Sequence, residues 1–254
     1  AVGAEAAQHL RDVHEEVIPR IADISEEIHK EHPTAEVNNW TDAPLTQIGS
    51  TESSVFASSR GWIGDLTGAQ VYLLNTQGKG VALDPENGTI SRGETDLSNG
   101  IRIYVAADIP NARGFSPART LTHEGLHALF RSVKAADGNS LRKAFAGFAK
   151  RDMKLLMGFN AFRASPEGTR YTKRYKDPNA VYEEYAAKLF AHQYGNTEEQ
   201  KSVLKFIRDN IPDFPIEEYT KQMKALDELY AAPKTVEQAI EKKPAPPEVL
   251  PAPE

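Results

Sequence analysis

Apolar residues recur with a helical period at both ends of the chain and with a strand-like pattern between them. Residues 4–31 place apolar side chains three or four positions apart, which predicts an amphipathic helix or helix pair. Between residues 70 and 108, short apolar runs separated by turn residues predict strands of a small twisted sheet: QVYLLNT, KGVALD and GIRIYVAAD. The helical period then returns and predicts helices near 117–133, 140–157, 179–194, 197–210 and 215–231.

Two segments lack this regularity and set the expected domain boundaries. Residues 33–69 are rich in Ser, Thr, Gly and Asn, which predicts a loop region. Residues 232–254 are dominated by Pro, Lys, Glu and Ala, a composition typical of a disordered tail. We therefore expect an α+β protein with an N-terminal helical segment over 1–32, one folded domain over 33–231, and the Pro-rich tail. The folded domain should combine a small twisted N-terminal sheet with a mainly helical C-terminal half.

Composition and charge narrow the classes of function. The net charge of −6 offers no overall positive field for a phosphate backbone, so no nucleic-acid partner is expected. No apolar run approaches the roughly 18 residues of a membrane span, and the N-terminus lacks the pattern of a signal peptide. The first residue, an Ala, and the linker-like end KKPAPPEVLPAPE predict a processed piece of a larger phage or secreted protein, whose compartment stays open. Because the chain has no cysteine, a transition-metal site must use His, Asp and Glu.

The pentapeptide HEGLH, residues 123–127, carries the strongest chemical signal in the sequence. Histidines four positions apart on a helix differ by about 40° in direction and about 6 Å in rise, so His123 and His127 can bind one metal ion. Glu124 lies about 100° round the helix from His123, beside the expected ion, which suits a general base. The alternative is a pair of ordinary histidines at the edge of the core. The strand before this helix and the helices after it favour the metal site.

The third ligand must lie elsewhere in the chain, because a catalytic zinc site needs three protein ligands and an open position. Phe130 and Val133 stand where the metzincin pattern requires Gly and His, which excludes that pattern. The segment NAVYEEYAAKLFAHQY predicts a helix with Glu183 at the edge of its apolar face, so Glu183 is the predicted third ligand. Glu184 is the alternative, because a helical phase read from sequence can be off by one residue. His192 is predicted to be a polar-face histidine or a substrate-side donor.

The stretches LTHEGLHALF and YKDPNAVYEEYAAKLFAHQY together resemble the HExxH-plus-Glu zincins, or gluzincins, and are particularly similar to their anthrax lethal factor-like branch. A weaker similarity is to the metallopeptidase domains of phage and mobile-element polyvalent proteins. The resemblance implies a zincin-like metallopeptidase domain over 33–231. Within it, His123, His127 and Glu183 would bind one Zn²⁺ and Glu124 would be the catalytic base.

The same resemblance implies a tyrosine that stabilises the oxyanion, and Tyr175 is the predicted residue. Two departures from the branch bear on this assignment. Ala187 stands four positions after Glu183, where the branch often has a second acid. The spacing from Tyr175 to Glu183 is about one residue longer than expected, so Tyr171 and Tyr182 are alternatives.

These features predict a zinc endopeptidase that hydrolyses peptide bonds through a metal-bound water activated by Glu124. Its partner would be a protein or peptide substrate, bound as an added strand along 101–107. The alternative is a catalytically inactive zincin-fold domain that binds or scaffolds within a larger phage or toxin-type assembly. Partner binding through the N-terminal helix or the Pro-rich tail can accompany either. The basic segment FRASPEGTRYTKRYK, residues 162–176, is predicted to be a solvated loop, with steering of an acidic substrate as the alternative.

Overall fold

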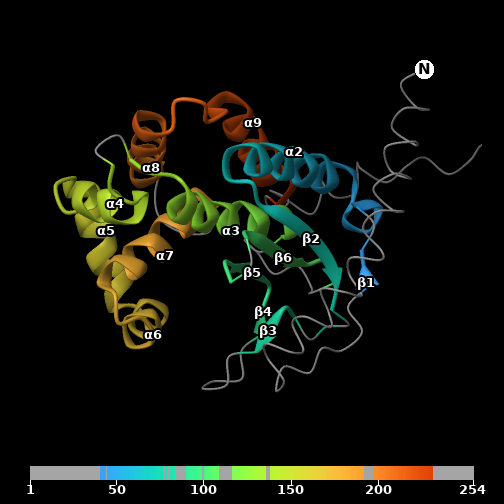
Figure 1. Cartoon of the computed structure of the whole chain (residues 1–254), viewed down its shortest axis with the longest axis horizontal. Helices are drawn as coiled ribbons and strands as arrows, with labels where there is room; N and C mark the ends of the chain where they lie inside the picture. Colours follow the sequence, from blue (N-terminus) through green and yellow to red (C-terminus); the bar gives the residue numbers. More distant parts are fainter. Residues whose placement is uncertain are drawn as a thin grey trace, which may run out of the picture.

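A mixed sheet and a larger group of helices form two neighbouring parts of the molecule (Figure 1). The computed structural model describes residues 41–43, 45–76, 78, 80–83, 90–98, 100–108, 116–135, 138–191 and 197–230. The predicted N-terminal segment, the Pro-rich tail and His192 lie outside the described residues, so those assignments stay predictions.

The main sheet has the strand order β1-β2-β6-β5. Its strands are β1 (Thr41–Asp42), β2 (Gln70–Asn75), β5 (Gly93–Asp96) and β6 (Arg102–Ala106). β2 and β6 are parallel, whereas β1 and β5 are antiparallel to their neighbours. The short strands β3 (Ala82–Leu83) and β4 (Ile90–Ser91) form a separate antiparallel pair. The α+β class with a small mixed sheet before a mainly helical half is therefore confirmed.

Helix α2 (Ser50–Thr67) occupies much of the region predicted to be a loop, so that prediction is wrong. Its many Ser, Thr and Gly residues conceal a buried apolar face that includes Phe56 and Ile63. Packing outweighs the weak helix propensity of these residues. The helix ends at Gly68, whose φ of 71° lies in the left-handed region that glycine adopts readily.

Seven α-helices follow the sheet in the described part of the chain. They are α3 (Pro117–Ser132), α4 (Leu141–Ala149), α5 (Met153–Ala164), α6 (Pro166–Arg174), α7 (Pro178–Phe190), α8 (Thr197–Asn210) and α9 (Ile216–Tyr230). The single helix predicted over 140–157 is divided into α4 and α5, because the Asp152 side chain accepts hydrogen bonds from Lys154 N and Leu155 N and starts a new helix. None of these helices is long and apolar enough to cross a membrane.

Helices α3 and α7 lie at the centre of the fold. α3 packs against α2, α7 and the strands β5 and β6, while α7 also packs against α4, α6 and α8. Leu121, Leu126, Leu129 and Leu189 are fully buried in this core. Since burying one leucine side chain contributes about 1.5–3 kcal/mol, the two helices are held firmly against each other. The residues of the HEGLH motif and the acidic pair of α7 therefore project from rigid elements.

Candidate metal centre

The start of α3 is held in place by two oxygen acceptors. Ser116 Oγ accepts a hydrogen bond from Arg119 N at 3.2 Å, and the Glu52 carboxylate of α2 accepts one from Ala118 N at 2.7 Å. Both satisfy backbone N–H groups that the first helical turn leaves without partners. The motif residues follow in the next turns, where α3 is buried between the sheet and α7.

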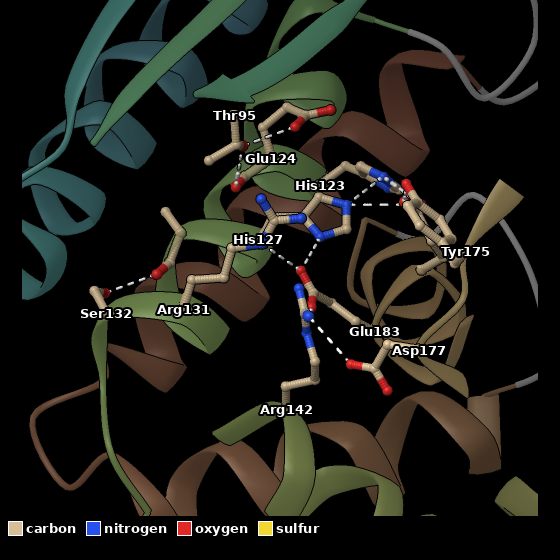
Figure 2. Close-up of polar contacts among 12 residues, drawn as sticks. Thr95, His123, Glu124, His127, Arg131, Ser132, Arg142, Tyr175, Asp177 and Glu183 are labelled. Carbon is tan, nitrogen blue, oxygen red and sulfur yellow. Dashed lines mark hydrogen bonds and ion pairs between the residues drawn. The ribbon is translucent and has the colours of Figure 1, made fainter. Parts of the chain in front are cut away.

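Three side chains bring their donor atoms together: two histidines of α3, which are labelled in Figure 2, and one acid of α7. The Nε2 atoms of His123 and His127 lie 3.2 Å apart. Glu184 Oε2 lies 3.6 Å from His123 Nε2 and 3.7 Å from His127 Nε2. The His123, His127 and Glu184 side chains thus form a buried triad that could hold a metal ion.

The spacing of this triad is compatible with tetrahedral coordination of one metal ion. Donor atoms around tetrahedral zinc, with bonds of about 2.0–2.1 Å, lie about 3.3–3.4 Å apart, close to the spacing of the triad. His127 Nδ1 is hydrogen-bonded to the Glu183 carboxylate, so its Nε2 is the nitrogen that faces His123 and Glu184. Buried His123 Nδ1 has no hydrogen-bond partner in the described part of the chain.

Glu183, the predicted third ligand, contacts the other nitrogen of His127. Its Oε1 accepts hydrogen bonds from His127 Nδ1 at 2.6 Å and from Arg131 Nε at 3.1 Å, and its Oε2 accepts one from Arg142 Nε. The structure therefore groups Glu184, the alternative, with the histidines and places Glu183 behind His127. The sequence favoured Glu183 because of its apolar face, but α7 is buried on all sides, so that face does not mark the side that meets α3.

Tyr175 reaches the site from the end of α6. Its hydroxyl donates a hydrogen bond of 2.7 Å to Glu184 Oε1, the oxygen that does not face the histidines. Burial and the Glu184 charge raise the pKa of Tyr175 above its usual value, so the phenol stays protonated. The Tyr171 ring stacks parallel to Tyr175 at 6.0 Å, whereas Tyr182 stacks on Phe159 of α5. Tyr175 and Tyr171 thus border the site, and Tyr182 does not contact it.

Glu124 is held at the edge of the sheet. Its Oε2 accepts a hydrogen bond from Thr95 Oγ1 of β5 at 2.8 Å. A Cβ atom at Gly93 would lie 2.5 Å from Thr120 Cγ2 and 2.8 Å from Glu124 Cγ, so glycine lets β5 approach α3 this closely. The predicted substrate strand around 101–107 contains β6, which pairs with β2 on one side and β5 on the other. Among the described strands, β5 is the one with a free edge beside Glu124.

The charges around the triad are strongly coupled. Burial lowers the pKa of His127, but the charges and hydrogen bonds of Glu184 and Glu183 outweigh burial and raise it to about 10. Burial alone would raise the pKa of Glu184, yet attraction to His127 and hydrogen bonding with His123 hold it well below its usual value. The Glu184 carboxylate is therefore ionised, and the surrounding acids favour a positive charge at the site.

Comparisons of the chain with protein-family models, curated proteins and solved structures find no match. The zincin likeness thus rests on the motif and on the geometry of the triad. Sequence reasoning missed Thr95, Arg131 and Arg142. Arg131 had a usable signal, because it lies four residues after His127 on the same helix, whereas the other two belong to elements whose approach depends on the tertiary fold.

Proposed function

We propose that this chain is a zinc-dependent endopeptidase in which His123, His127 and Glu184 bind one zinc ion. The observation that carries the proposal is the convergence of these three donors, with ligand atoms no more than 3.7 Å apart. Glu124 lies on α3 between the two histidines of this set. Two imidazoles and one carboxylate are a donor set that zinc enzymes use when they leave a position open. The bound zinc would act as a Lewis acid and lower the pKa of water.

Glu124 is the residue proposed to move protons. It would take a proton from the attacking water and deliver it to the amide nitrogen as the peptide C–N bond breaks, giving a carboxylate and an amine. Thr95 holds the Glu124 carboxylate in one orientation through the 2.8 Å hydrogen bond. The Tyr175 hydroxyl donates its one hydrogen to Glu184 Oε1. It would turn from that carboxylate to donate to the carbonyl oxygen as this oxygen becomes an oxyanion.

The free edge of β5 is the proposed place for the substrate backbone. An extended peptide can add to such an edge through main-chain hydrogen bonds, and β5 lies directly against Glu124. This assignment replaces the one from the sequence, because β6 has no free edge. The peptide would then pass between β5 and the Tyr175 end of α6.

The decisive experiment compares wild type with Glu124→Gln. Both proteins should bind one zinc per chain by metal analysis, but only wild type should cleave a peptide library read by mass spectrometry. We expect the loss of activity to be at least about 10³-fold, because the variant lacks the base but keeps the ligands. Equal cleavage by the two proteins would contradict the role of Glu124. Zinc binding without cleavage by wild type would instead favour an inactive zincin-fold binding domain.

A further inference from the structure

The segment 163–176 has a charge opposite to that of the rest of the chain. It contains Arg163, Arg170, Lys173, Arg174 and Lys176, which we call the basic border, and one acid, Glu167. Its net charge of +4 within a chain of net charge −6 leaves −10 for all other residues. Such a local reversal creates a positive potential that the whole-chain charge conceals.

In the structure, this segment covers the end of α5 and the helix α6, whereas the sequence predicted a loop, and its cations are exposed. Arg163 lies near the end of α5, the next three cations lie on α6, and Lys176 follows α6; all five are exposed. Glu167 does not neutralise them, because it pairs with buried Lys188 of α7 at 2.7 Å. Arg170, Lys173 and Lys176 form no ion pair with the acids of the described residues. By contrast, Lys154, Lys201 and Lys205 each pair with an acid on α8.

The basic border lies next to the triad. Arg174 and Lys176 flank Tyr175, whose hydroxyl contacts Glu184, and the Arg174 guanidinium lies 5.7 Å from the Tyr175 ring. Charges act over about 8 Å at physiological ionic strength, and an extended peptide advances about 3.3 Å per residue. Acidic side chains within about four residues of the bond that is cleaved would therefore come within reach of these cations.

Helix stability alone does not account for the arrangement. Cations in the last turn of α5 and α6, such as Arg163, Lys173 and Arg174, favour the negative ends of the helix dipoles. Arg170 lies earlier in α6 and Lys176 lies beyond its end, so the dipole does not explain them. A nucleic acid is a poorer candidate than an acidic peptide, because the charge of −10 on the other residues would repel an extended phosphate backbone.

We propose that the basic border selects peptide substrates with Asp or Glu residues within a few positions of the cleaved bond. This inference rests on the proposed peptidase site, since it assigns the substrate class of that site. The cations raise the local concentration of acidic peptides and fix their direction across the β5 edge. They do this without touching the reacting atoms.

Binding is measured with zinc-loaded Glu124→Gln protein, which should hold a peptide without cutting it. Fluorescence anisotropy compares length-matched acidic, neutral and basic peptides at about 0.05 M and about 0.5 M salt. The test variant adds Arg170→Glu and Lys173→Glu. A matched control adds Lys221→Glu and Lys224→Glu on α9, where two exposed lysines give the same change in net charge away from α6 (Figure 1).

We expect the acidic peptide to bind about tenfold tighter than the neutral one at low salt, and this preference to vanish at high salt. At low salt, the preference should also vanish in the α6 variant but persist in the α9 control. Equal loss in the α9 control, or no preference, would overturn the proposal. So would tighter binding of a single-stranded oligonucleotide of equal charge. Cleavage of the same peptides by wild type separates the two proposals. Cutting without acidic preference contradicts only the basic border, whereas acidic preference without cutting contradicts only the peptidase.

Discussion

Glu183 and Glu184 are adjacent in the sequence and both buried, yet they contact different nitrogens of His127. Glu183 forms a hydrogen bond with His127 Nδ1, whereas Glu184 Oε2 lies within 3.7 Å of the Nε2 atoms of both histidines. Figure 2 shows the Nδ1 side, where Glu183 also meets two arginines. Adjacent residues on a helix point about 100° apart. Glu183 therefore orients the ligand His127, whereas Glu184 can itself be a metal ligand.

The charge partners of the two carboxylates explain this division. Glu183 faces the guanidinium groups of Arg131 and Arg142, so its charge is already balanced. In the described residues, Glu184 has the neutral Tyr175 hydroxyl and two imidazoles as its polar contacts. A buried carboxylate is costly unless it is paired. Without a metal, His127, whose pKa is raised to about 10, supplies the positive charge beside Glu184, and a bound metal ion would take its place. The structure thus separates a neutralised carboxylate from one available to a metal.

The largest effect should follow Glu184→Gln. This change keeps the side-chain volume but removes the anionic donor, so zinc affinity should fall by roughly a thousandfold. Competition with a calibrated zinc chelator measures the affinity, and circular dichroism checks that the fold is kept. Zinc affinity that stays within about threefold of wild type would mean that Glu184 is not the third ligand.

Glu183→Gln is the matched change one residue away, and its effect should be smaller. Zinc affinity should fall about 10–100-fold, because residues that orient a ligand contribute on that scale. The metal-free protein should also lose about 2 kcal/mol of stability in urea unfolding, since two arginines that are only partly exposed lose their shared partner. If the two variants exchanged their zinc affinities, Glu183 would be the ligand, as the sequence predicts.

The elements and site residues that depend on local spacing could be predicted from the sequence. His123, Glu124 and His127 belong to one helix, so the i, i+4 rule is enough to bring the histidines together. The choice between Glu183 and Glu184 depends on how α7 is rotated against α3. Because α7 is buried on all sides, its apolar pattern contains no such information.

Elements with weak local signals were missed for related reasons. β5 has the sequence GETD, with no apolar alternation. It is held instead by backbone pairing with β6 and by the close approach to α3 at Gly93. α2 is rich in residues typical of loops, and only the packing of Phe56 and Ile63 reveals it as a helix. Both elements are defined by partners distant in sequence.

Tyr175→Phe should have the smallest effect on zinc affinity, a change of a few-fold, because it removes one hydrogen bond to the Glu184 oxygen that lies away from the histidines. The phenyl ring can still stack on Tyr171, so the end of α6 should keep its position. If the hydroxyl donates to the oxyanion, kcat should fall about 10²-fold with KM nearly unchanged, even at saturating zinc. Tyr182→Phe is the control, since Tyr182 stacks on Phe159 away from the triad and should leave kcat unchanged. Full recovery of kcat at saturating zinc would instead show that Tyr175 acts only by holding Glu184.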